Sequence, residues 1–305
     1  MLFTPPPMPP SNPVVTIWVH GTRSHESLPT PLARVAKKVA KGVAGGDPGL
    51  YHVSKFNPEH YEALRASVLG TTAPILFPQE YMYSFGWSGN LNLQARKNAS
   101  QELFVHLKQL HYEILEKTGL APEFILIAHS HGGNVVLHLA EIKDPDGFEL
   151  TVTKAILLAC PVQKDTSHLV DSSLFKRIYS LHSHTDMIQV IDMQGIKRKK
   201  RSEKPLFSER HFESHPKLVQ AQIRWKNSPG EYGYDPIMNK GALKYLTNGI
   251  KMINILKKNR GLLHIEFILL PFLRHLGSII AQLDELFDSS GNCPSHKDHD
   301  IVIEL

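Results

Sequence analysis

The sequence predicts an α/β protein built on a doubly wound, mostly parallel sheet of about six strands. Short apolar segments of strand length alternate along the chain with segments whose apolar residues recur at helical spacing. Strands that alternate with helices need crossover connections, and such connections make neighbouring strands parallel. The 305 residues, of which 42% are hydrophobic, suffice for one large core and do not require a second domain.

Six segments have the length and composition of strands, because each is short and rich in apolar or β-branched residues. In chain order they are residues 14–19, 81–85, 124–128, 155–159, 176–181 and 218–225. The chain between the first two strands is rich in Gly and Pro. We therefore expect loops there, preceded by a short helix at residues 31–43.

Longer periodic segments between the strands are predicted helices. Residues 93–117 repeat apolar side chains on one helical face, and residues 135–142 follow the strand at 124–128. The final helix is expected to begin near Pro271, because proline suits a first helical turn. Its apolar face comprises Phe272, Leu276, Ile279, Ile280, Leu283 and Leu286. Residues 228–262 are assigned to a small helical insertion, with a cap beside the site as one interpretation.

A predicted strand runs directly into a turn that carries a serine. Residues 124–134 read Phe-Ile-Leu-Ile-Ala-His-Ser-His-Gly-Gly-Asn, so Ser130 lies in an A-x-S-x-G pattern. Such a turn strains the backbone at the serine and brings strand and helix close together, so it needs small residues beside the serine. Ala128, His129 and Gly132 are therefore the predicted elbow residues around a nucleophilic Ser130. The five-residue pattern alone is common, and the flanking strand and helix favour the nucleophile over a structural turn.

The chain resembles the α/β-hydrolase superfamily, in particular lipase-like and esterase-like members with an A-H-S-x-G elbow. The resemblance covers residues 14–287, but only residues 18–22, with their His-Gly turn, and 125–134 are specific. The segment Phe85-Gly-Trp-Ser-Gly89 is similar to the W-S-G turn of some bacterial members. The resemblance implies the α/β-hydrolase fold and the chain order serine, acid, histidine. It does not fix the substrate.

The acid that orients the catalytic histidine should follow a later strand. Asp186 lies in that place, in Ser183-His-Thr-Asp186 after the strand at 176–181. Asp192 and Asp165 are the alternatives, the latter if the acid follows the preceding strand. An aspartate after a strand is otherwise often a turn-former.

The histidine is harder to choose, because the chain has 18 of them. The resemblance places it on the loop before the final helix, where His264 lies. His215 and His211 come next because they precede the strand at 218–225, and His275 comes last because it lies inside a predicted helix. Residues 227–234 contain no histidine, so either the loop is elongated here or the triad is incomplete.

An oxyanion needs preorganised donors, which backbone amides supply. The resemblance implies the amide of His131, the residue after the nucleophile, together with that of Gly21 or Thr22. His20 is interpreted as an organiser of its turn. His129 and His131 flank the serine, but neighbours on an elbow point away from the nucleophile, so neither is predicted to be the base.

No cofactor or metal is expected. The segments His182-Ser-His184 and 296–300 bring imidazoles together, but no third ligand follows at recognisable spacing.

The formal net charge is +5 and the pI is near 9.0, with much of the positive excess in the run from Lys197 to Lys204. This run is interpreted as a solvated loop, with peripheral contact to anionic lipid or a nuclear import signal as alternatives. No aromatic residues alternate with its charges, so nucleic-acid binding is not expected.

The predicted organisation is a Pro-rich extended arm at 1–13, a catalytic domain at 14–288 and a polar tail at 289–305. The first residues lack a signal-peptide pattern, and no uncharged apolar stretch of about 18 residues exists. The two cysteines are widely separated, which favours a reducing compartment. We expect a cytoplasmic protein, with delivery into a host cell as a compositional alternative; the oligomeric state stays open.

The sequence therefore predicts a serine hydrolase that cleaves carboxylic esters through an acyl-enzyme. Lipid esters come slightly ahead of small soluble esters because residues 262–270 are apolar, although core packing explains these residues equally well. A thioesterase or amidase would use the same groups. The alternative is a catalytically silent module that binds a partner protein or membrane through residues 197–204 or the tail. A histidine close to Ser130 would discriminate between the two.

Overall fold

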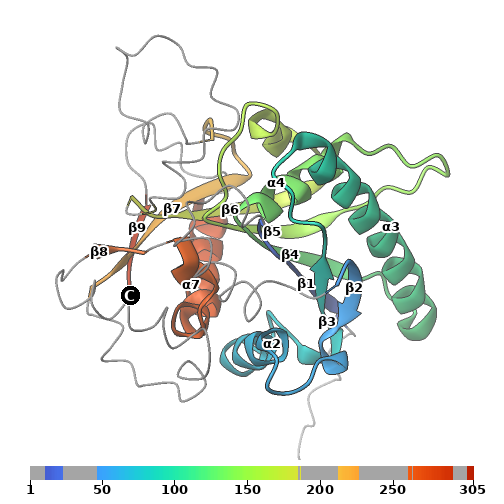
Figure 1. Ribbon diagram of the computed structural model, residues 1–305, viewed down its shortest axis with the longest axis horizontal. Helices are drawn as coiled ribbons and strands as arrows, with labels where there is room; N and C mark the ends of the chain where they lie inside the picture. The colour runs from blue at the N-terminus through green and yellow to red at the C-terminus, as the bar shows by residue number, and fades with distance from the viewer. Residues whose placement is uncertain are drawn as a thin grey trace, which may run out of the picture.

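The computed structural model describes residues 11–22, 47–184, 186, 212–226, 260–262, 264–290 and 301–305 (Figure 1). Three predicted features lie outside these residues: the helix at 31–43, most of the insertion at 228–262, and the basic run from Lys197 to Lys204. Most of the N-terminal arm lies outside them as well.

One sheet forms the centre of the described chain, and its strand order is β2-β3-β1-β4-β5-β6-β7-β8, with β9 paired to β7. Its strands are β1 (Val14–Val19), β2 (Gly49–His52), β3 (Met82–Gly86), β4 (Glu123–His129), β5 (Val152–Leu158), β6 (Phe175–His182), β7 (Leu218–Trp225), β8 (Arg260–Gly261) and β9 (Ile301–Glu304). The central pairs are parallel, and among the described strands only β2 and β8 pair antiparallel. All six predicted strands are present, and three further short ones extend the sheet at its edges.

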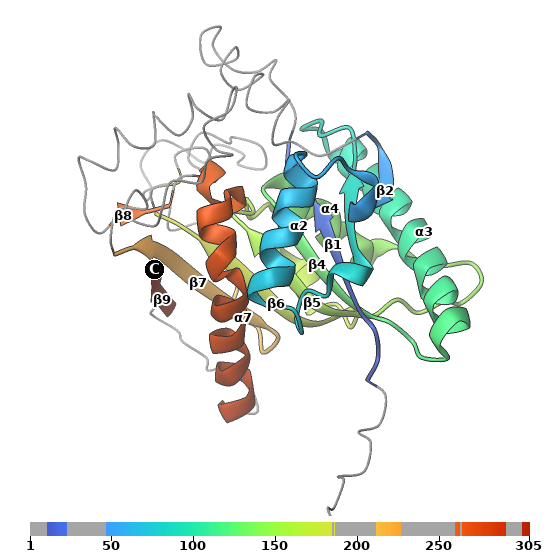
Figure 2. The same cartoon turned by 90° about the horizontal axis from the view of Figure 1, so that it is seen from below.

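Helices cover both faces of this sheet. The described α-helices are α2 (Tyr61–Thr72), α3 (Leu93–Thr118), α4 (His131–His138) and α7 (Leu270–Ser290). Short 3-10 helices are η1 (Val53–Lys55), η2 (Gln79–Tyr81), η3 (Leu139–Glu141), η4 (Ser167–Asp171) and η7 (His264–Ile268). Helices α2 and α7 lie side by side on one face, and α3 and α4 cover the other (Figures 1 and 2). The predicted doubly wound α/β fold is confirmed.

The central strands are buried on both faces, so they read as continuous apolar runs. Along β4, Ile125 and Ile127 pack with α2 and α7, whereas Leu126 and Ala128 pack with α3 and α4. Successive side chains of a strand point to opposite faces, and this alternation divides the core into two layers. The strand that leads to Ser130 is therefore fixed from both sides.

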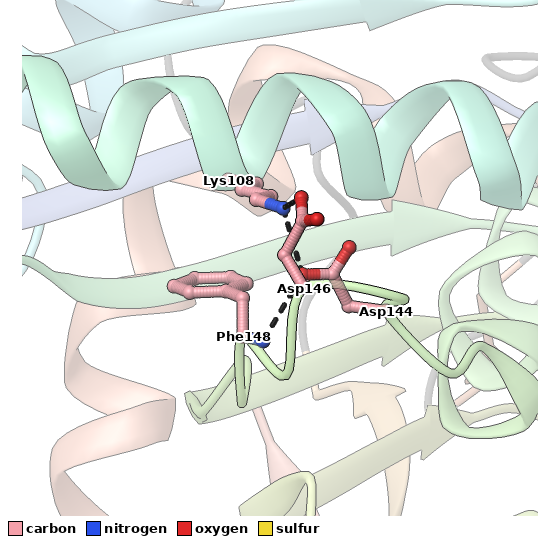
Figure 3. A network of polar contacts seen from close by, with 4 residues as sticks. All are labelled: Lys108, Asp144, Asp146 and Phe148. Carbon is pink, nitrogen blue, oxygen red and sulfur yellow. Dashed lines mark hydrogen bonds and ion pairs between the residues drawn. The ribbon is translucent and has the colours of Figure 1, made fainter.

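Helix α3 is delimited by the caps that helices commonly use. The Asn92 side chain accepts a hydrogen bond from the Ala95 amide, and Gly119 adopts a left-handed conformation at the C-terminal end, with φ 72°. In the middle of the helix, Lys108 donates to Asp144 and Asp146 at 2.7 Å each (Figure 3). The Lys108 contact holds the pKa of the Asp144 carboxyl below its usual range. The two ion pairs of Lys108 thus tie α3 to the loop before β5.

The sequence prediction missed α2 because two charged residues interrupt its apolar face. Glu62 and Arg65 are both buried, form an ion pair with each other, and lie against the sheet. The Arg65 guanidinium stacks 3.8 Å from the Trp18 ring centroid, and Ser84 donates to Glu62 at 2.9 Å. Helical periodicity counts apolar residues, so a buried ion pair on the inner face hides the helix.

The ends of the sheet also differ from expectation. β2 has four residues, none of them buried, so its sequence carries no period-2 pattern. Residues 289–305 were expected to be a polar tail, but α7 continues to Ser290 and residues 301–304 form β9 beside β7. The amide of Leu305 donates to the Arg224 carbonyl at 2.9 Å. The last five residues therefore belong to the sheet.

Among the described helices, none combines the length and apolarity needed to cross a membrane.

Candidate active site

Ser130 is held in a strained backbone conformation where β4 ends and α4 begins. Its φ is 53° and its ψ is −133°, and among the described non-glycine residues only Ala159 shares a positive φ. Such a conformation costs about 1–3 kcal/mol and persists only where the surroundings enforce it. One such constraint is the Ser130 amide, which donates to the Leu158 carbonyl of β5 at 2.8 Å. The geometry is that of a serine presented on a sharp strand-to-helix turn.

Glycines allow the elbow to pack against the turn that follows β1. A Cβ at Gly132 would lie 2.5 Å from the His20 carbonyl oxygen and 2.8 Å from that of Val19. A Cβ at Gly21 would lie 2.8 Å from the Ser130 Cβ and 2.9 Å from the His129 carbonyl oxygen. Backbone meets backbone at both places, so neither residue has room for a side chain. Ala128, on β4 two residues before Ser130, is fully buried and pairs in register with Val19 and Leu157.

We expect Gly132→Ala to destabilise the protein by about 1–3 kcal/mol and to lower any activity of the site, because the new methyl group would push the elbow away from the turn after β1. Urea unfolding with an activity assay measures both effects. Gly70→Ala is the matched control in helix α2, where the three atoms nearest to the added methyl group, from Cγ at 2.3 Å outward, all belong to the exposed Gln79 side chain, so that this side chain must move and no backbone contact is strained. Equal stability of Gly132→Ala and wild type would contradict the close approach.

His20 organises the turn after β1, in agreement with the role that the sequence suggested for it. Its Nε2 accepts a hydrogen bond from the Trp87 amide at 2.9 Å, so the neutral ring carries its proton on Nδ1, which donates to the Gly21 carbonyl at 2.6 Å. The Trp87 indole donates in turn to the His20 carbonyl at 2.8 Å, and the two rings stack. Both ring nitrogens are engaged, so His20 fastens its turn to the Gly-Trp-Ser-Gly turn after β3.

The predicted acid and the predicted histidine lie in direct contact. Asp186 Oδ2 is 2.7 Å from His264 Nδ1, and both side chains are buried. Asp186 follows β6, and its amide donates to the Ser183 carbonyl at 3.2 Å. His264 is the first residue of η7, directly before α7. Two segments separated by 78 residues thus meet at one buried hydrogen bond.

The alternatives weighed from the sequence are placed elsewhere. Asp165 is exposed, and His215 contacts Asp171 at 3.4 Å near the start of β7. His275 lies inside α7, where its ring packs edge-on against Trp225. Asp192 and His211 lie outside the described residues.

The elbow and the Asp186–His264 pair are linked through His129. The His129 and His264 rings are 4.6 Å apart between centroids, and His129 Nε2 is 3.1 Å from the His264 carbonyl oxygen. His264 therefore contacts the residue immediately before Ser130. The sequence reasoning treated His129 only as an elbow residue and missed this contact, since no local pattern records a neighbour 135 residues away.

The candidate oxyanion donors lie around the same serine. His131 is the first residue of α4, so its amide is at the N-terminal end of the helix that follows Ser130. Gly21 lies against Ser130 from the side of the β1 turn, and Thr22 follows it. The part of the chain that the structure describes holds no group of three or more His, Cys, Asp or Glu side chains suited to a metal ion.

Comparisons with known proteins leave the family open. No family model matches the sequence, and no curated protein matches it. The structure is similar to the siderophore hydrolase EstB from Aspergillus fumigatus, with 18% identity over 51% of this chain and a TM-score of 0.29. The match spans 38% of the length of EstB. The product of the lin2722 gene from Listeria innocua matches over 96% of this chain and 99% of its own, with 13% identity and a TM-score of 0.30. At these TM-scores neither similarity assigns a family or a function.

Proposed function

We propose that the protein is a serine hydrolase that cleaves carboxylic esters through an acyl-enzyme. Ser130 is the nucleophile, His264 the general base and Asp186 the acid that orients the histidine. The observation that carries the proposal is the buried 2.7 Å contact between Asp186 Oδ2 and His264 Nδ1, where His264 contacts His129, the residue directly before the strained Ser130 with φ 53°. A strained serine and a buried carboxylate–imidazole pair are the parts that nucleophilic acyl transfer needs.

The geometry supports the following proton path. A carboxylate that accepts from Nδ1–H leaves Nε2 of His264 unprotonated, so Nε2 takes the hydroxyl proton of Ser130 as Oγ attacks the ester carbonyl carbon. The amides of His131 and of Gly21 or Thr22 donate to the resulting oxyanion. When the carbon–oxygen bond to the alcohol breaks, the alcohol leaves with the proton from Nε2.

The second half of the reaction repeats these steps with water. Nε2 of His264 takes a proton from a water molecule, whose oxygen attacks the acyl carbon. The bond to Ser130 Oγ then breaks, and Oγ recovers the proton from Nε2 as the carboxylic acid leaves. No cofactor takes part in this scheme. The Asp186 carboxylate stabilises the imidazolium of His264 in both halves.

The acyl group is not restricted to long chains in this proposal. The apolar residues that favoured lipid esters, such as Leu262, Phe267 and Leu270, are fully or almost fully buried in the core beside α7. They form part of the hydrophobic core and cannot line an exposed surface for an acyl chain. We therefore propose short soluble esters and lipid esters as equally suitable substrates. We further propose a cytoplasmic protein in which the basic run from Lys197 to Lys204 is a solvated loop, with peripheral membrane contact as the alternative.

A fluorophosphonate probe and a series of p-nitrophenyl esters test the proposal. We expect one adduct per chain, mapped by mass spectrometry to the peptide that contains Ser130, and hydrolysis of at least the short esters. Heat-unfolded protein is the control, since labelling needs the assembled site. A folded wild type that neither reacts with the probe nor hydrolyses any ester of the series would favour the catalytically silent binding module instead.

A further inference from the structure

The His129 ring lies between two parts of the candidate active site. On one side its Nε2 is 3.1 Å from the His264 carbonyl oxygen, and the two imidazole rings are 4.6 Å apart. On the other side its Nδ1 lies 3.0 Å from the place that a Cβ of Gly21 would occupy. One buried ring therefore touches both the residue that carries the base and the turn that faces Ser130.

The hydrogen bond fixes the protonation of this ring. A carbonyl oxygen can only accept, so His129 Nε2 carries the proton and donates it to the backbone of His264. Burial lowers the pKa of His129 well below its usual value. The rings of His264 and His20 and the charge of Arg65 lower it further, against the opposing effect of the hydrogen bond to the His264 carbonyl. The ring is therefore neutral, with Nδ1 unprotonated beside Gly21.

We propose that His129 is a positioning residue, whose neutral ring anchors the backbone of His264 and keeps its imidazole within reach of Ser130. This inference rests on the proposed function, because it assigns a role within the same site. His264 starts a 3-10 helix of five residues, a form with poor internal hydrogen bonds. A donor from the end of β4 therefore anchors the first residue of a segment whose own hydrogen bonds are weak.

The neutrality of His129 matters as much as its hydrogen bond. His264 becomes an imidazolium when it takes the serine proton, and a second positive ring at this distance would oppose that step.

Asp186 contacts the imidazole Nδ1 of His264, whereas His129 donates to the backbone carbonyl of the same residue. The two contacts fix the side chain and the main chain of the base separately.

Three variants test the proposal. His129→Leu keeps the volume and removes the donor, so we expect kcat for a p-nitrophenyl ester to fall about 10- to 100-fold with little change in KM. His129→Gln can still donate from its amide nitrogen and should restore most of kcat. His138→Gln is the matched control at another buried histidine. His138 ends α4 and contacts Glu141 of η3, so this variant should lower the Tm and leave kcat unchanged.

A second measurement does not need activity. The measurement is a proton NMR spectrum of Ser130→Ala protein labelled with nitrogen-15 histidine, in which the Nδ1 proton shared by His264 and Asp186 should give a downfield resonance. This resonance should remain when His129→Gln is added and should be lost to solvent exchange when His129→Leu is added. If kcat and the resonance were both unchanged in His129→Leu, the proposal would be overturned. It would also be overturned if kcat fell in His129→Leu and His129→Gln alike and in proportion to their loss of Tm. If the wild type hydrolysed no ester, the proposed function would fail, and the resonance would still decide the role of His129.

Discussion

Replacing Ser130 with alanine is expected to lower kcat for ester hydrolysis by about a millionfold and to abolish labelling by the fluorophosphonate probe. Without Oγ, no acyl-enzyme forms, and His264 can only activate water directly. The fold should survive, because the substitution removes one oxygen and leaves intact the amide hydrogen bond from residue 130 to Leu158. Residual hydrolysis above the uncatalysed rate would come from the oxyanion donors and substrate binding.

The control for this substitution is a second buried serine. Ser100 lies on α3, and its hydroxyl is buried without a hydrogen-bond partner among the described residues. Ser100→Ala should therefore keep full kcat and probe labelling, measured in parallel with circular dichroism spectra of both variants. Ester hydrolysis that persisted in Ser130→Ala at a rate near that of wild type would show that another group is the nucleophile.

The elbow could be predicted from the sequence because its determinants are local. An apolar strand, the serine and the small residues Ala128 and Gly132 all fall within eleven residues, and each follows from the strain and close packing of one turn. The bounds of β1 and β7 were predicted without error, since β1 is short and almost wholly apolar and β7 alternates polar with apolar residues over most of its length. Local signals of this kind need no knowledge of the rest of the fold.

The proposed catalytic partners of Ser130 could not be chosen from local signals alone. Composition could not select among 18 histidines, and His264 was chosen only through the resemblance to the superfamily. The contacts of His129 with His264 and of Trp87 with His20 join distant segments, so no spacing rule records them. Helix α2 was missed for a related reason, because the buried Glu62–Arg65 pair replaces apolar side chains on its inner face.

Asp186→Asn is expected to lower kcat by about 10⁴-fold while leaving the fold and KM close to those of wild type. The carboxylate accepts the Nδ1 proton of His264, whereas an amide nitrogen at the same place would donate to Nδ1 and shift the imidazole proton to Nε2. A protonated Nε2 cannot accept the proton of Ser130.

Asp171→Asn is the matched control. Asp171 also contacts a histidine, His215 at 3.4 Å, but its side chain is 67% exposed. Steady-state kinetics should show a loss in the first variant alone. Equal losses in both would mean that Asp186 acts on stability and does not orient His264.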